Sequence, residues 1–346
     1  MNFCSDNAQG IAPEILAAIE ATNEGSARAY GSDALSETVT KKIAALFERE
    51  AEVFLIGTGT ASNALALSVM SPPHGGIFCH REAHIEVDEC GAALFYTGGA
   101  KLVLLDGSHA KIDPKAFEAA LDALDPAQHY IQPKAISLSQ LSEAGTAYSI
   151  DEIRTLSDLA HKHGLTVHMD GARFANALVS LGCSPAEMTW KAGVDVLSFG
   201  ATKNGAMGAE AVVVFNPDLA GEMGYRRKRG GHLFSKMRFV ACQLDAYLEN
   251  DLWLKMATHA NQTAARLAEG LAAIEAVSLL HPADGNMMLA AMPKSLATAI
   301  KADGFDFYEW PGETPDTTKA RLVTAFNTKS QDVDGFLASA RRHEGG

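Results

Sequence analysis

Short apolar runs alternate with segments of helical periodicity through the first two thirds of the chain. The runs are almost entirely hydrophobic, which is typical of strands that are buried on both faces. This alternation predicts an α/β fold, with a parallel or mixed β-sheet covered by helices on both sides. The strand candidates are residues 53–56, 76–79, 101–105, 135–138, 165–169, 194–199 and 211–215.

Helical segments precede the first strand and separate most of the others. Leu35, Val39 and Ile43 recur at helical spacing, and Ser32 or Asp33 can cap this helix at its N-terminus. Ligands of open α/β sheets bind at the carboxyl ends of the strands, so residues just after a strand are the first candidates for a site. The other predicted helices are residues 13–21, a segment ending at Met70, a segment from His84 toward Leu94, and residues 151–163 and 172–181.

The pattern changes near residue 225. Two long proline-free helices are predicted over residues 234–249 and 252–274. Short strands follow at residues 287–291 and 321–326, with a turn at Trp310-Pro311-Gly312 between them. We therefore predict an N-terminal arm and large cofactor-binding domain over residues 1–245, and a smaller C-terminal α+β domain over residues 246–346, of which residues 341–346 are frayed.

Composition and charge narrow the classes of partner. The 346 residues include 42 Asp and Glu against 29 Lys and Arg, a formal charge of −13, which disfavours a nucleic-acid partner. No apolar run reaches the roughly 20 residues that span a bilayer, and the N-terminus lacks the pattern of a secretory signal, so we expect no membrane segment. The five cysteines are scattered, which favours reduced thiols in the cytoplasm over a disulfide or metal framework.

The first candidate for chemistry is the turn Gly57-Thr58-Gly59-Thr60, between a predicted strand and a predicted helix. Glycine lets backbone N–H groups approach an anion, and the start of the helix adds the positive end of its dipole. The turn lacks the Lys-Ser/Thr of a P-loop and the third glycine of a dinucleotide fingerprint, which speaks against a nicotinamide cofactor. It is either a phosphate cradle or a tight connection.

Two further candidates follow apolar strands. Asp170 begins Asp170-Gly171-Ala172-Arg173, where a buried carboxylate needs a cation or several donors; the alternative is a helix N-cap. Lys203 stands among small residues in a glycine-bounded turn, where desolvation favours the nucleophilic amine; the alternative is a solvated loop lysine. A glycine-rich helix start, an acid and a lysine, together with His84, fit a pyridoxal phosphate site, which needs partners for a phosphate, a ring, a ring nitrogen and an aldehyde.

At these residues the sequence resembles the L-threonine aldolases of the beta-eliminating lyase group, which have the aspartate-aminotransferase-like fold. The resemblance runs from Phe3-Cys4-Ser5-Asp6-Asn7 to Arg321-Leu322-Val323-Thr324. Its most specific parts are Tyr30-Gly31-Ser32-Asp33, Thr58-Gly59-Thr60-Ala61-Ser62-Asn63, His84 with Glu89, Asp170-Gly171-Ala172-Arg173 and Lys203.

The resemblance implies a fold and a reaction. The large domain is expected to have three αβα layers around a mostly parallel mixed sheet. With pyridoxal 5′-phosphate bound, the enzyme is expected to cleave L-threonine, L-allo-threonine and other L-3-hydroxy amino acids such as phenylserine into glycine and an aldehyde. The resemblance also implies a homotetramer with active sites between subunits.

The resemblance also implies residue roles. Lys203 would hold the cofactor covalently, Asp170 would keep its pyridine nitrogen protonated, and His84 would stack on its ring near the substrate hydroxyl, as the base or as a neutral orienting group. The phosphate cradle would consist of Gly59, Thr60 and Ala61. The substrate-binding residues would be Ser5, Arg173 and Arg321, with Tyr30 from a neighbouring subunit; Arg173 also counts among the cofactor-binding residues. The residues that could reach a phosphate across a subunit contact, among which the sequence does not choose, are Arg226, Arg227, Lys228, Arg229 and Lys236.

Departures from the family pattern leave alternatives open. Many members carry Ser-Lys-Gly-Leu-Gly around the lysine, whereas this chain has the Lys203-Asn204-Gly205 form of other members, so the lysine assignment stands and the substrate preference is open. His129 falls about where some members place a second hydroxyl-facing histidine, or it is an exposed loop residue. The rival functions are another pyridoxal-phosphate-dependent lyase or aminotransferase, a non-catalytic binding protein of the same fold, and a metal-dependent hydrolase using His80, His84, His168 and Asp170.

Overall fold

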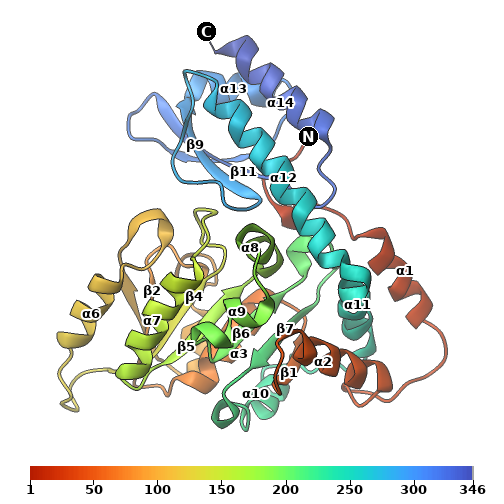
Figure 1. The fold of residues 1–346 in the computed structure, drawn as a ribbon, viewed down its shortest axis with the longest axis vertical. Coiled ribbons are helices and arrows are strands. Elements are labelled where there is room, and N and C mark those ends of the chain that lie inside the picture. The colour runs from red at the N-terminus through yellow and green to blue at the C-terminus, as the bar shows by residue number, and fades with distance from the viewer. Residues whose placement is uncertain (345–346) are drawn as a thin grey trace.

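A computed structural model describes residues 1–344 of the chain. Figure 1 shows a large domain around one sheet, a smaller domain around a second sheet, and helix α12 (Leu252–Ala272) passing from the first to the second. The first half of this helix packs in the large-domain core through Trp253 and Met256. Its second half packs in the small-domain core through Leu267 and Leu271.

The large domain is built on a seven-stranded mixed sheet in the order β1-β7-β6-β5-β4-β2-β3. Strand β7 runs antiparallel to both β1 and β6, whereas β6, β5, β4, β2 and β3 pair in parallel. The strands are β1 (Glu52–Ile56), β2 (Gly75–His80), β3 (Lys101–Leu105), β4 (Gln132–Ser139), β5 (Thr166–Gly171), β6 (Val196–Gly200) and β7 (Glu210–Val214).

Helices cover both faces of this sheet. Successive strand residues alternate between two cores: Phe78 and Leu197 face one, and Ile77 and Val196 face the other. The first core also contains residues of α2, α7, α8 and α11, and the second contains residues of α3, α5 and α10. The helices are α1 (Pro13–Thr22), α2 (Ala34–Leu46), α3 (Gly59–Met70), α4 (His84–Val87), α5 (Ala92–Thr97), α6 (Pro114–Asp122), α7 (Ile150–Lys162), α8 (Phe174–Leu181), α9 (Pro185–Met188), α10 (Met223–Arg229) and α11 (Arg238–Leu248). The predicted three-layer α/β fold is confirmed.

The small domain has an antiparallel sheet in the order β10-β11-β9-β8. The N-terminal arm belongs to it in part, because Phe3 is buried in its core and stacks edge-on to Phe336 at 5.3 Å. The division at residue 245 stays a prediction. The elements are β8 (Ser278–Leu279), β9 (Met287–Pro293), α13 (Lys294–Ala302), β10 (Tyr308–Pro311), β11 (Thr317–Val323) and α14 (Ser330–His343).

Three local predictions are wrong. The segment from His84 toward Leu94 forms two short helices, because Cys90 and Gly91 have left-handed backbones with φ of 50° and 73°. The predicted turn at Trp310-Pro311-Gly312 contains the end of β10, an edge strand that tolerates a proline. The tail is helical as far as His343, which together with Arg342 contacts the Asp303 carboxylate; Gly345 and Gly346 lie outside the described residues.

Two features relate to the expected environment of the chain, namely the state of its cysteines and the character of its helices. Cys4, Cys79, Cys90, Cys183 and Cys242 are all free thiols. None of the helices within residues 1–344 combines the length and the apolar character that a membrane span requires.

Phe47 is the aromatic centre of the larger core, so its truncation tests the packing. Its ring is fully buried and lies 5.1 Å from Phe215, 6.1 Å from Phe174 and 6.3 Å from Phe199. We expect Phe47→Ala to lower the free energy of unfolding by about 3–5 kcal/mol, because it leaves a cavity that these rings cannot fill. Urea denaturation measures the loss, and Tyr130→Ala, at a side chain that is 57% exposed, should leave the transition in place.

Candidate active site at the carboxyl edge of the large sheet

A cavity of about 400 Å³ opens where β5 and β6 end. Its volume is in the range of pockets that hold cofactors and small substrates. The lining includes Gly59, Thr60, His84, Asp170 and Lys203, so the fold brings together five of the predicted site residues from separate segments.

The glycine-rich turn forms one wall of the cavity at the start of α3. The Thr58 hydroxyl caps the helix by accepting the N–H of Ala61 at 3.3 Å. The Ala61 side chain is buried. A Cβ on Gly57 would lie 2.5 Å from the Phe234 ring, whereas a Cβ on Gly59 would meet no atom within 4 Å. A side chain at position 57 would therefore displace the Phe234 ring, whereas Gly59 leaves open space beside the N-terminus of the helix.

A chain of buried hydrogen bonds forms the floor. The Asn63 amide donates to Glu89 Oε1 at 2.8 Å and to Asp170 Oδ2 at 2.9 Å. Glu89 Oε1 also contacts Nδ1 of His84 at 2.8 Å, and the Ala172 N–H donates to Asp170 Oδ1 at 3.0 Å. Within residues 1–344, Asn63 Oδ1 and Glu89 Oε2 are buried without a hydrogen-bond partner, so the floor is not fully satisfied by the protein itself.

The protonation of His84 depends on this chain. The hydrogen bond that His84 Nδ1 donates to Glu89 raises the pKa of His84, and the charges of Asp170 and Glu143 act in the same direction. Burial raises the pKa of the Glu89 carboxyl, with the neighbouring Asp170 charge adding to it. The contact with Glu89 therefore favours the charged form of His84.

Lys203 sits in the short 3₁₀ turn η4 (Thr202–Asn204) after β6. The Asn204 amide fixes this turn by donating to the Tyr247 hydroxyl and to the Trp253 carbonyl, both at 2.9 Å. Beside it, Glu210 accepts the Thr202 N–H at 3.3 Å, and burial raises the pKa of the Glu210 carboxyl to about 7.

The predicted carboxylate-binding residues gather around the N-terminal arm. Arg173 forms a buried two-point ion pair with Asp6, at 2.8 and 3.0 Å, and Arg321 donates to the Cys4 carbonyl at 3.3 Å. The two arginines thus hold the residues on either side of Ser5, although none of the three is among the residues that line the cavity itself. Although burial opposes it, the Arg173 charge lowers the pKa of the Asp6 carboxyl, so the pair is ionised.

Other predicted residues lie away from the cavity of this protomer. Tyr30 is half-exposed, with the Lys228 ammonium 4.3 Å from its ring centre, and within residues 1–344 none of the basic residues of α10 lines the cavity. His129 is exposed and precedes β4, so it lies at the opposite edge of the sheet.

The rival metal site is assembled in part: His84 and Asp170 lie together with Glu89, with ligand atoms within 4.8 Å of one another, whereas His168 and His80 have other partners. His168 is fully buried between the hydroxyls of Ser137 and Ser198, at 2.9 and 3.0 Å, and burial lowers its pKa to about 4. His80 contacts the Gly107 carbonyl at 3.3 Å. The side chains of both histidines therefore have partners other than His84 and Asp170.

Several contacts were not predicted from the sequence. Asn63 follows Gly59 by one helical turn, which places both on the site-facing end of α3, and that spacing could have indicated it. Nothing in the local sequence indicated a role for Asp6 or Glu210. Asp6 lies on the N-terminal arm and Glu210 at the start of an antiparallel strand, and both acquire their contacts only when distant segments pack.

Comparisons with known proteins show the family to which this chain belongs. Residues 2–294 match the family described as beta-eliminating lyase. The chain is 44% identical to a low specificity L-threonine aldolase of Pseudomonas aeruginosa, over 96% of this chain and 94% of that protein. It is 40% identical to a low specificity L-threonine aldolase of a Pseudomonas species, over 98% and 96% of the two chains.

A solved structure agrees over the full length. A threonine aldolase of Leishmania major superposes with a TM-score of 0.94 at 27% identity, and 99% of each chain is covered. Together with the family match, this likeness shows that the chain is a member of the beta-eliminating lyase family.

Proposed function

We propose that this protein is a pyridoxal-phosphate-dependent aldolase that cleaves L-threonine and L-allo-threonine to glycine and acetaldehyde. Other L-3-hydroxy amino acids, such as phenylserine, are included in the proposal. The observation that carries it is the convergence of Lys203, Asp170, His84 and the start of α3 on one cavity. The names of the two Pseudomonas relatives support the choice of substrate.

The residues of the cavity fit the cofactor. The open space at Gly59 and the N-terminus of α3 suit its phosphate, and Asp170, oriented by two N–H donors, suits a protonated pyridine nitrogen. Lys203 is on a turn fixed to the protein core, where its amine can hold the aldehyde carbon. When bound, the cofactor supplies an electron sink for the bond that breaks at Cα.

The chain's own residues bind and orient the substrate in this proposal. Arg173 and Arg321 hold the substrate carboxylate together with Ser5, which sets the Cα–Cβ bond perpendicular to the cofactor ring. Asp6 already occupies Nε and Nη2 of Arg173, so the guanidinium is held in place and Nη1 is the nitrogen left for the substrate. His84 Nε2 donates a hydrogen bond to the β-hydroxyl oxygen, which becomes the aldehyde oxygen.

The protein is further proposed to be a cytoplasmic homotetramer with sites between subunits. Its free thiols suit a reducing compartment. A second cavity of about 820 Å³ is flanked by Phe95 and Tyr225, both 80% exposed, which is the kind of apolar surface that a second copy covers. Tyr30 and the basic residues of α10 would then lie near a neighbour's cofactor phosphate.

Replacement of Lys203 tests the proposed function. We expect Lys203→Ala to lose the visible absorption of protein-bound cofactor and to reduce acetaldehyde release from both threonine diastereomers to background, because no other amine is held at this place. Lys191→Ala, at an exposed lysine paired with Glu48, should behave like wild type. An unchanged spectrum and rate in Lys203→Ala would contradict the proposal, and product analysis with serine and a keto acid separates elimination and transamination.

The Glu89 contact can be tested by titration. In Glu89→Gln we expect the pKa of His84 to fall, since the carboxylate that stabilises its charged form is gone. NMR of the imidazole nitrogens against pH measures the change. His161, whose pKa is raised by a separate hydrogen bond from Asp195, serves as the internal reference and should not move. A His84 titration that matches wild type would refute the assignment.

The proposed tetramer predicts the behaviour of the exposed aromatic residues. The double variant Phe95→Asp, Tyr225→Asp should dissociate to smaller species, because two charges would be buried in the subunit contact. Light scattering after size exclusion gives the mass, and Tyr130→Asp is the matched control. A variant that keeps the wild-type mass shows that this surface is not the contact.

A further inference from the structure

Glu210 is a buried carboxyl group in the wall of the candidate cavity. It is the first residue of β7 and is only 5% exposed. Side chains alternate between the two faces of a strand, and Val212 and Val214, which follow Glu210 at steps of two, belong to the core that contains residues of α3. The strand therefore directs Glu210 to the face of the sheet on which α3 begins.

The Glu210 side chain caps the turn that carries Lys203. Gly200, the last residue of β6, is paired with Glu210 in the antiparallel ladder, so the turn leaves the sheet and returns to it at one level. Glu210 Oε1 accepts the Thr202 N–H at 3.3 Å, and the Ala209 N–H donates to the Thr202 hydroxyl at 3.2 Å. The residue directly before Lys203 is therefore bound to the start of β7 through both its backbone and its side chain.

The rest of the loop between β6 and β7 is held by α11. Gln243 Oε1 accepts the N–H groups of Met207 and Gly208, at 2.9 and 3.1 Å. Lys203 and Glu210 both line the cavity, and the loop that joins them is fixed at each end and in the middle. The carboxyl group thus has a defined position in relation to the backbone of the lysine.

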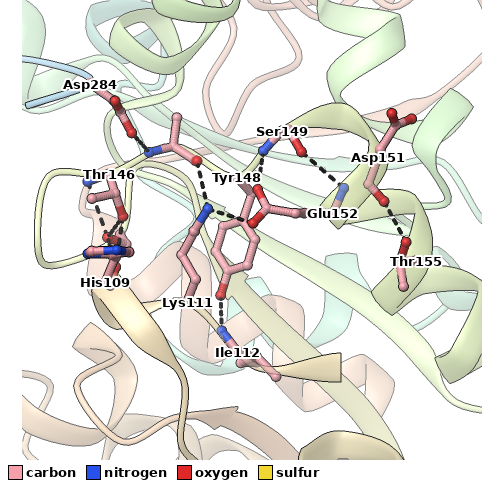
Figure 2. Close-up of polar contacts among 12 residues, drawn as sticks. His109, Lys111, Ile112, Thr146, Tyr148, Ser149, Asp151, Glu152, Thr155 and Asp284 are labelled. Atoms are coloured by element: carbon pink, nitrogen blue, oxygen red, sulfur yellow. Dashed lines mark hydrogen bonds and ion pairs between the residues drawn. The ribbon is translucent and has the colours of Figure 1, made fainter. Parts of the chain in front are cut away.

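No cation neutralises the Glu210 carboxyl by direct contact. Among residues 1–344 it takes part in no ion pair, and its hydrogen bond comes from an uncharged N–H group. Glu152 differs in this respect, because Lys111 Nζ donates to its Oε1 at 2.6 Å (Figure 2). Although burial opposes it, that contact lowers the pKa of the Glu152 carboxyl. A buried carboxyl group without such a partner holds its proton to higher pH.

The charges around the cavity act on Glu210 in opposite directions. Burial raises the pKa of the Glu210 carboxyl to about 7, the charge of Lys203 opposes this rise, and the charge of Asp170 adds to it. Tyr247 of α11 stays uncharged, because burial raises the pKa of its hydroxyl. An interaction between two ionisable groups acts equally on both, so a carboxylate that Lys203 stabilises also stabilises the protonated nitrogen of Lys203.

We infer that Glu210 is a positioning residue for Lys203, which caps the turn of the lysine and supplies a carboxylate that favours the protonated form of its nitrogen. This inference rests on the proposed function, in which that nitrogen holds the cofactor. A neutral Glu210 keeps the cap, since a carboxyl oxygen still accepts the Thr202 N–H, and loses only the charge. Protonation of Glu210 therefore changes the charge near the reacting nitrogen without releasing the turn.

The first test follows the absorbance of the cofactor-loaded enzyme against pH. This absorbance changes when the nitrogen that is joined to the cofactor loses its proton. Glu210→Gln keeps the size of the side chain and an oxygen for the Thr202 N–H but removes the charge, so we expect the midpoint of the change to fall by about one pH unit or more. Glu210→Asp should restore most of this difference. Glu118→Gln, at an exposed position of α6, is the control.

A second measurement follows Glu210 itself in the full chain without cofactor. The infrared band of the protonated carboxyl, identified by its loss in Glu210→Gln, gives the pKa of Glu210. In Lys203→Ala we expect this pKa to rise above the wild-type value, because the charge that lowers it is gone. Lys191→Ala, at the exposed lysine paired with Glu48, should leave it in place.

The outcomes separate the inference from the proposed function. In an enzyme that binds the cofactor and cleaves threonine, a wild-type midpoint in Glu210→Gln overturns the role of Glu210 alone, and so does an unchanged pKa of Glu210 in Lys203→Ala. Loss of the cofactor band in both Glu210→Gln and Glu210→Asp also overturns it, because the residue would then be structural. A wild-type chain that takes up no cofactor contradicts the proposed function and the inference with it.

Discussion

Two buried carboxylates share one amide at the centre of this structure. Asp170 and Glu89 come from different segments, and their charges would repel in a medium of low polarity unless a donor stood between them. The Asn63 Nδ2 group donates to both, so α3, β5 and the segment after α4 have to meet at one point. The position of the His84 ring follows from the same bridge, because its Nδ1 contacts the Glu89 oxygen that accepts from Asn63.

A second buried pair couples the N-terminal arm to this centre. Asp6 binds Arg173 at two points, and Asn286 of the small domain donates to the same Asp6 carboxylate at 3.1 Å. The N-terminal arm, the large domain and the small domain therefore meet at one buried carboxylate, which Arg173 neutralises and Asn286 hydrogen-bonds. Because Asn286 and Arg173 share the Asp6 carboxylate, a movement of the small domain would change the position of Arg173. Arg173 is the residue that we propose to hold the substrate carboxylate.

The sequence was sufficient to predict candidate site residues that come directly after a strand. Asp170 and Lys203 were predicted because an apolar run ends just before each of them, and the parallel order of the strands brings such ends together. Asp6 and Glu210 were missed because their partners come from distant segments that only packing brings near. The helix break at Cys90 and Gly91 was missed because the left-handed backbones of these two residues decide it.

The acidic character of the chain extends into its site. The cationic groups Lys203, Arg173 and Arg321 are accompanied by four acids of the site and its arm, which are Asp6, Glu89, Asp170 and Glu210. Burial acts on two of these acids, since it raises the pKa of the Glu89 carboxyl and raises that of the Glu210 carboxyl to about 7. A phosphate bound in the same cavity finds mainly N–H and hydroxyl donors on this chain, which is why basic residues from a neighbouring subunit would complete its binding.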